Sequence, residues 1–198
     1  KAFDLAFTDT CVLDIGASTG GFTDFALQHG ARQVIALDVG KGQLALKLLE
    51  DPRVINLEGV NFREWDGDLG DRCLVLGVRG VDYALIDVSF ISLITILTQL
   101  KGLINDPNTK HLSPKTQIIA LLKPQFEAGK EIMDKCQGVI RDDEVREKVK
   151  EKICQKIQDL GYQIENIIES PIKGAKGNKE YLLGLNLKKK KNGIKKLV

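Results

Sequence analysis

A glycine-rich run flanked by acids is the part of this sequence whose residue types and spacing most directly suggest chemistry. Residues 13–22 read LDIGASTGGF and lie between an apolar stretch and a segment with helical spacing. A second acid, Asp38, follows 22 positions after Gly16, at the end of the next apolar run. A glycine-rich turn between a strand and a helix commonly binds a nucleotide-like ligand, because it lets the backbone approach that ligand closely. We therefore interpret the loop and Asp38 as parts of one binding site.

The loop departs from the dinucleotide fingerprint GxGxxG in a way that changes the expected ligand. Ser18 stands where the fingerprint has its second glycine, which clears room for a pyrophosphate. Asp14 precedes the loop, and its carboxylate would repel phosphates but accept hydrogen bonds from a cationic amine. S-adenosylmethionine has an ammonium group and no phosphate, and Asp38 could accept hydrogen bonds from both hydroxyls of its ribose. The pattern favours this cofactor; the alternative for Asp14 is that it simply caps the following helix.

The residues expected to hold the cofactor come from three places in the chain. They are Asp14, Gly16, Ala17, Ser18, Thr19, Gly20, Gly21, Phe22, Asp38, Val39, Gly40 and Asn61. Asn61 follows the third expected strand, where its amide could reach the adenine edge; an exposed turn is the alternative. The four cysteines show no CxxC pair, so neither a metal site nor a disulfide framework is expected. With no secretory segment at the start, the sequence predicts a reduced, cytoplasmic protein.

Three further ionisable side chains are expected to meet in the same crevice. Asp87 ends the fourth expected strand, Lys123 ends the fifth and Glu180 begins the last. Open α/β sheets bind ligands at the carboxyl ends of strands, where the strand order reverses. Each residue alone would more simply be a solvated strand end, but their joint placement indicates catalysis. A ribose hydroxyl needs such help: Lys123 could act as a base, or as an ammonium held by Asp87 and oriented by Glu180.

The elements that must position these groups form an alternating series. Strands are expected at 11–15, 33–38, 53–58, 81–87, 116–122, 163–169 and 181–187, and helices at 23–28, 42–50, 91–103 and 144–160. This alternation predicts a doubly wound, Rossmann-like α/β domain, with a mostly parallel seven-stranded sheet and helices on both faces. Residues 170–180 are too few for a crossover helix, so the strands expected at 163–169 and 181–187 should form an antiparallel, hairpin-like pair at the sheet edge. Residues 59–80 are predicted to form a loop.

Length and charge limit the domain organisation. The 198 residues suffice for one full domain. Six lysines lie in residues 188–198, so the net charge of +2 becomes −4 for the rest of the chain, and any nucleic-acid contact must be local. The apolar run 88–100 is shorter than the ~20 residues of a membrane span and predicts a buried helix. The opening KAFDLAF is interpreted as the end of a helix, which suggests that a preceding segment is not included.

Six motifs relate the sequence to a known family. In order they read LDIGASTGGFTD, DVGKGQL, DPRV, DVSFISL, LLKPQFEAGK and SPIKGAKGNKEYLL. Over residues 11–187 the chain closely resembles the TlyA, or hemolysin A-like, ribosomal RNA methyltransferases, which are relatives of the FtsJ ribose methyltransferases. The resemblance implies a class I methyltransferase fold and the use of S-adenosylmethionine to methylate cytidine 2′-hydroxyls of ribosomal RNA.

The resemblance also implies roles for individual residues. The family's catalytic tetrad is Lys, Asp, Lys and Glu, and Asp87, Lys123 and Glu180 match its last three members. Its first lysine would lie upstream of Lys1, as would the family's small N-terminal RNA-binding domain. We therefore expect a methyltransferase domain over residues 1–187, followed by a basic tail over 188–198. At Lys41 and Leu46 the family usually has aromatic residues, so these two departures affect the expected shape of the adenosine pocket.

Three rival functions follow from the same sequence. DVSF after the fourth strand also resembles the Asp-Pro-Pro-Tyr signature of enzymes that methylate base amines, although Val88 and Ser89 replace both prolines. A membrane-lytic protein and a catalytically silent RNA-binding module are the others. RNA contacts are expected at Lys173, Lys176 and Lys179, which precede Glu180, whereas the lysine tail is interpreted as a solvated end. The sequence does not determine the oligomeric state.

Overall fold

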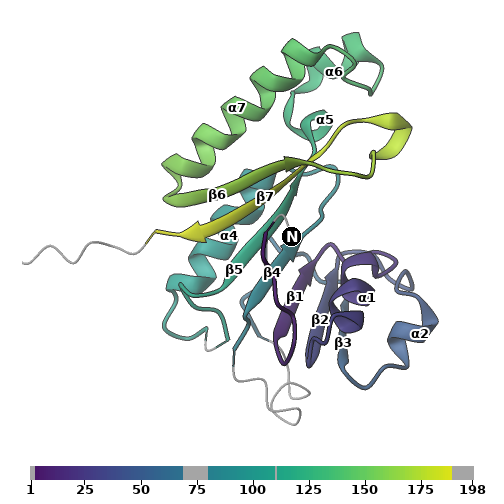
Figure 1. The fold of residues 1–198 in the computed structure, drawn as a ribbon, viewed down its shortest axis with the longest axis vertical. Coiled ribbons are helices and arrows are strands. Elements are labelled where there is room, and N and C mark those ends of the chain that lie inside the picture. Colours follow the sequence, from purple (N-terminus) through teal and green to yellow (C-terminus); the bar gives the residue numbers. More distant parts are fainter. Residues whose placement is uncertain (1–2, 69–79, 110, 189–198) are drawn as a thin grey trace, which may run out of the picture.

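The computed structural model describes residues 3–68, 80–109 and 111–188, which form a seven-stranded sheet with helices packed on both faces (Figure 1). The strands are β1 Cys11–Ile15, β2 Gln33–Asp38, β3 Val54–Glu58, β4 Tyr83–Ile86, β5 Gln117–Leu122, β6 Tyr162–Glu169 and β7 Tyr181–Leu187. The helices are α1 Gly21–Gln28, α2 Leu46–Leu49, α4 Leu93–Asn105, α5 Pro124–Glu127, α6 Lys130–Cys136 and α7 Asp143–Asp159, with a 3-10 turn at Ala175–Gly177.

The strand order is β3-β2-β1-β4-β5-β7-β6. β7 runs antiparallel to both of its neighbours, and the other paired strands are parallel. The predicted fold class is confirmed, because the short connection after β6 returns the chain as an antiparallel strand between β5 and β6. The order reverses between β1 and β4, so the loops that follow these two strands open a crevice at the carboxyl edge of the sheet.

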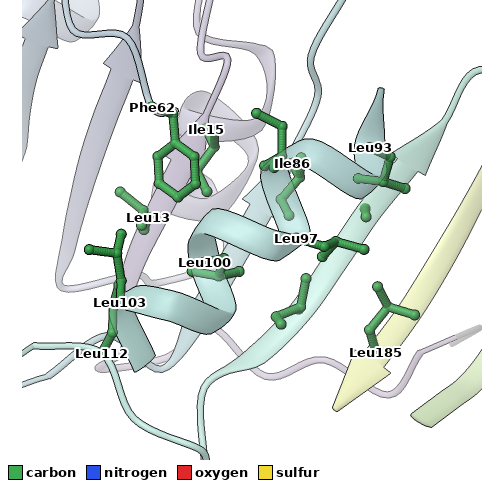
Figure 2. Packing of buried hydrophobic residues seen from close by; sticks show 14 of the residues in the cluster. Leu13, Ile15, Phe62, Ile86, Leu93, Leu97, Leu100, Leu103, Leu112 and Leu185 are labelled. Carbon is green, nitrogen blue, oxygen red and sulfur yellow. The ribbon is translucent and has the colours of Figure 1, made fainter. Parts of the chain in front are cut away.

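Two apolar layers fix the sheet in place. On one face α4 and α7 pack against the strands, and Figure 2 shows Leu97 and Leu100 of α4 in the same buried cluster as Leu13 and Ile86 of the sheet. α1 and α2 cover the other face. Successive residues of a strand point to opposite faces of the sheet, so Val12 of β1 packs on the α1 side. α4 begins where the Ser92 side chain accepts a hydrogen bond from the Ile94 amide.

Three local expectations differ from the structure. The opening segment is not the end of a helix: residues 3–7 are irregular, and Phe7 packs its ring 5.0 Å from that of Tyr83 on the sheet face. The helix expected at 42–50 shortens to α2, and α5 and α6 were not predicted. α6 has no buried residue, so it carries no amphipathic signal. Residues 59–68 of the expected loop contain no helix or strand, whereas residues 69–79 and nearly all of the lysine tail lie outside the described residues.

Because Leu97 is 0 % exposed at the centre of the α4 layer, its truncation should be costly. We expect Leu97→Ala to lower the free energy of unfolding by about 3 kcal/mol, through lost burial and a residual cavity. Thr98→Ala, at the next and exposed position, should change it by less than about 0.5 kcal/mol. Urea unfolding followed by circular dichroism measures both. Equal losses in the two variants would contradict the assignment of this helix face.

Candidate active site

The turn from β1 into α1 packs tightly against the end of β4. Gly16 has φ +85°, and a Cβ added there would overlap the backbone oxygen of Asp87, so this position requires glycine. The amides of Gly16 and Ala17 both donate to the Leu37 carbonyl, at 2.8 and 3.1 Å. The glycine loop is therefore fastened to β2 on one side and to the β4 end on the other.

Asp14 is buried at the start of this loop and is 1 % exposed. Its Oδ2 accepts a hydrogen bond of 2.7 Å from the Thr23 hydroxyl in the first turn of α1. Its Oδ1 has no hydrogen-bond partner among the described residues. Burial raises the Asp14 pKa from its ordinary value of 3.8 to about 7, against the opposing effect of the Thr23 hydrogen bond. Anchoring of α1 thus accounts for one oxygen, and the other is open to a cationic ligand.

Asp38 joins the glycine loop to the turn after β2. Its two carboxylate oxygens accept hydrogen bonds from the amides of Ser18, at 2.8 Å, and Gly40, at 2.7 Å. Each oxygen keeps a further lone pair, so the carboxylate can still accept hydroxyl groups of a ligand. The sequence suggested a ribose-binding role for Asp38, and the structure adds that this residue shapes the loop itself.

Two cavities lie along the carboxyl edge of the sheet and share Gly16, Ser18 and Asp87 in their walls. One, of about 780 Å³, is lined by Asp14 and most of the glycine loop, including Ala17, Thr19, Gly21 and Phe22. The other, of about 440 Å³, is lined by Asp38, Val39 and Asn61. Ten of the twelve predicted cofactor residues therefore line a cavity.

Two of the predicted cofactor residues, Gly20 and Gly40, line neither cavity. Gly20 has φ +98°, and an added Cβ would overlap Leu48 of α2, while Gly40 donates its amide to Asp38. Asn61 is also part of a turn, because its Oδ1 accepts the Arg63 amide at 3.2 Å. Asn61 therefore forms part of a turn and also lines the cavity.

The three predicted catalytic residues converge at this edge. Lys123 Nζ lies 2.6 Å from Asp87 Oδ1 and donates a hydrogen bond of 3.0 Å to the Ser89 hydroxyl. Glu180 is 5 % exposed, and its Oε1 accepts a hydrogen bond of 2.7 Å from Gln125 Nε2. Burial raises the pKa of Glu180, while the Gln125 hydrogen bond and the Lys123 charge oppose that rise. Asp87 lines both cavities and brings the Lys123–Asp87 pair to their shared edge, whereas Lys123 and Glu180 themselves line neither cavity.

The FtsJ-like methyltransferase family model matches residues 1–187. The chain belongs to this family. It is 43% identical over 188 residues to a Bacillus subtilis protein described as a candidate rRNA methyltransferase, YqxC, covering 94% of this chain and 61% of that protein. It is 40% identical over 185 residues to the 16S/23S rRNA (cytidine-2′-O)-methyltransferase TlyA of Mycobacterium tuberculosis, covering 93% of this chain and 63% of that protein.

A solved structure agrees with this placement. A candidate hemolysin from Streptococcus thermophilus superposes with a TM-score of 0.79 at 42% identity, covering 94% of this chain and 62% of that one. This chain spans about three fifths of the length of these relatives. The matched part is the FtsJ-like methyltransferase domain, so what the longer proteins do as wholes needs evidence beyond the domain.

Several residues of the methyltransferase site were not predicted from the sequence. Ser89 and Gln125 contact Lys123 and Glu180 directly. Glu127 accepts hydrogen bonds from the Ser92 hydroxyl, at 2.7 Å, and the Leu93 amide, at 2.6 Å, and so holds the loop after β4 against α5. Ser89, Gln125 and Glu127 lie within the motifs DVSFISL and LLKPQFEAGK, but the order of residues in a motif does not indicate which side chains touch.

Asn178, two residues before Glu180, ties the loop that leads to Glu180 to residues 138 and 140. The Asn178 Oδ1 accepts the Ile140 amide at 3.1 Å, and its Nδ2 donates to the Gly138 carbonyl at 3.0 Å. Lys173 and Lys176 on this loop are exposed, whereas Lys179 is half-buried with its Nζ 3.6 Å from Glu169. Two of the three predicted RNA-contacting lysines are therefore presented to solvent, and the third already has an acidic neighbour.

Metal-binding clusters and membrane-spanning helices are absent from the described part of the chain. Within residues 3–68, 80–109 and 111–188, no group of three or more His, Cys, Asp or Glu side chains is arranged to hold a metal ion. The apolar run expected as a buried helix forms most of α4, and none of the described helices is long and apolar enough to cross a membrane.

The raised Asp14 pKa makes a prediction about stability. A carboxyl that ionises near 3.8 when unfolded and near 7 when folded destabilises the fold increasingly as the pH rises between these values. Relative to wild type, Asp14→Asn should therefore gain roughly 2–3 kcal/mol of unfolding free energy between about pH 5 and pH 8. Urea unfolding at both pH values measures the difference. The exposed Asp159→Asn is the matched control, and a gain as large in that control would contradict the argument.

Proposed function

We propose that this domain binds S-adenosylmethionine and transfers its methyl group to the 2′-hydroxyl of a ribose in ribosomal RNA. The observation that carries the proposal is the placement of the Lys123–Asp87 pair and buried Glu180 at the edge where Asp14 presents an unpartnered oxygen. The names of two relatives, one of them a cytidine-2′-O-methyltransferase, support the ribosomal substrate. A ribosomal substrate in turn places the enzyme in the cytoplasm.

The cavity walls fit the cofactor at both of its ends. The open Oδ1 of Asp14 suits the ammonium of the methionine part, because a buried carboxylate gains most from a charged hydrogen-bond donor. Asp38 and Asn61 line the cavity that would take the adenosine part. When bound, S-adenosylmethionine supplies an electrophilic methyl group on a sulfonium.

The residues of this chain would then act on the nucleophile. A hydroxyl attacks slowly at neutral pH because it keeps its proton, so a cation at the oxygen accelerates the step. The Lys123 Nζ forms an ion pair with Asp87 and donates a hydrogen bond to Ser89, and a further N–H of the ammonium can then point at the hydroxyl oxygen. We infer that Lys123 stabilises the negative charge that develops on this oxygen.

The contacts of Lys123 favour a hydroxyl over a base amine. An exocyclic amine needs no cation at its nitrogen, whereas this site holds a lysine ammonium in place with an ion pair and a hydroxyl. Phe90, which is 91 % exposed and packs its ring 4.9 Å from that of Phe126, adds an aromatic surface of the kind on which unstacked RNA bases rest. A catalytically silent RNA-binding module can be told apart from this enzyme by measurement, because it would show no affinity for the cofactor.

Cofactor binding is the first test. We expect titration calorimetry on this chain to show binding of S-adenosylmethionine that weakens at least about tenfold in Asp38→Ala, which loses hydrogen-bond acceptors for two loop amides and the ribose. The exposed Asp159→Ala should bind like the wild type. Binding of NAD in place of S-adenosylmethionine would overturn the cofactor assignment.

The nucleophile-directed roles predict a separation of binding from turnover. In a version of this domain extended to the length of its relatives, called the longer protein below, Lys123→Ala and Asp87→Ala should each reduce methyl transfer by about a hundredfold or more while cofactor affinity changes little. Lys148→Ala, an exposed change on α7, serves as the control. Near wild-type turnover in Lys123→Ala would favour the amine-directed rival.

We further propose that RNA affinity depends on an RNA-binding domain upstream of this one. Without the lysine-rich residues 188–198 the chain carries −4, and Lys173 and Lys176 offer few phosphate contacts. This chain should therefore methylate ribosomal subunits far more slowly than a version extended upstream to the relatives' length, as measured by transfer of a labelled methyl group at moderate salt. Equal rates would show that the upstream segment is dispensable.

A further inference from the structure

The carboxylate of Glu180 is held closely by two neighbours. Gln125 Nε2 donates a hydrogen bond of 2.7 Å to its Oε1. Gly174 lies against the same carboxylate, because an added Cβ there would overlap it. The amide of Gly174 donates to the Asn178 carbonyl at 2.8 Å and so fixes this backbone. The Glu180 carboxylate thus contacts one amide donor and fills the space that a side chain at position 174 would need.

The donor comes from the same helical turn as the catalytic lysine. α5 starts at Pro124, directly after Lys123, so this turn sends the Lys123 ammonium to Asp87 and the Gln125 amide to Glu180. Proline at the first helical position fixes the start of the turn. The spacing of the two acids therefore depends on a segment of only a few residues.

The hydrogen bonding of Gln125 is one-sided. Gln125 is 7 % exposed, yet its Oε1 has no hydrogen-bond partner within the described part of the chain. A buried amide with an unpaired acceptor makes the folded protein less stable than an apolar side chain of the same shape would. Among the described contacts, the hydrogen bond to Glu180 is the one that offsets this cost.

We propose that Gln125 is a positioning residue of the methyltransferase site, whose amide holds Glu180 as a carboxylate directed at the Lys123–Asp87 pair. Its catalytic consequence rests on the proposed function, whereas the contact itself does not. The charges that face Glu180 are Lys123 from the end of β5, which favours the carboxylate, and Asp87 from the end of β4, which opposes it. Gln125 adds a neutral donor to the favourable side.

The test compares Gln125→Met with Gln99→Met in this chain. Gln99, on α4, is a matched control, because its Nε2 also donates one hydrogen bond of 2.7 Å, to the Trp65 carbonyl and not to Glu180. The Glu180 pKa is read by carbon-13 NMR of glutamate carboxyls, with the resonance assigned by its loss in Glu180→Gln. We expect Gln125→Met to raise this pKa by about one to two units, because a charged acceptor loses its donor, and Gln99→Met to leave it unchanged.

An unchanged Glu180 pKa in folded Gln125→Met would overturn the proposal. If that variant does not fold, the wild type alone decides. The chemical shift of the Gln125 side-chain amide proton should change with pH at the Glu180 pKa. An amide proton shift that does not change there would also overturn the proposal.

In the longer protein, the acid limb of the pH–rate profile for methyl transfer should move to higher pH in Gln125→Met. A rate loss of the same factor at every pH would indicate a structural role only and overturn the positioning role. Absence of methyl transfer in the wild type would refute the proposed function, while the NMR titration would still decide the contact.

Discussion

The close contact between Gly16 and the Asp87 backbone is the constraint on which the site depends. β1 and β4 are neighbours where the strand order reverses, and only a glycine lets the loop after β1 reach the end of β4. Through this contact the two cavities come to share Gly16, Ser18 and Asp87. A cofactor held by the loop and a nucleophile held by Lys123 beside Asp87 would therefore meet at this edge of the sheet.

The buried ionisable groups around that contact each have one or two specific partners. Asp14 has the Thr23 hydroxyl, Lys123 has Asp87 and Ser89, and Glu180 has Gln125. Ions in such places are costly to bury, so the fold stabilises them with few contacts and leaves capacity for ligands. The apolar layers of α1 and α4 supply the stability that this arrangement draws on. Rigid support of this kind is what preorganised polar groups require to act on a transition state.

The sequence predicted the sheet well and the contacts poorly, for physical reasons. The seven strands were located because buried strands are short, continuous and β-branched, and the antiparallel β7 followed from the short connection before it. The same reasoning placed Asp87, Lys123 and Glu180 at one edge. It could not reveal Ser89 or Gln125, because strand ends specify position but not side-chain pairing. α6 was missed since none of its residues is buried, and residues 3–7 were misjudged because Phe7 packs on the sheet without helical structure.

We propose that Lys123, Asp87 and Glu180 direct a methyl group to a ribose oxygen, and the chemical identity of the product decides this. Ribosomal subunits from cells lacking the enzyme would be incubated with S-adenosylmethionine and the longer protein carrying this domain, and their RNA digested to nucleosides for mass spectrometry. We expect 2′-O-methylcytidine to be formed by the wild type and to be absent with Lys123→Ala. A methyl group on a base amine, or 2′-O-methylcytidine formed equally by Lys123→Ala, would contradict it.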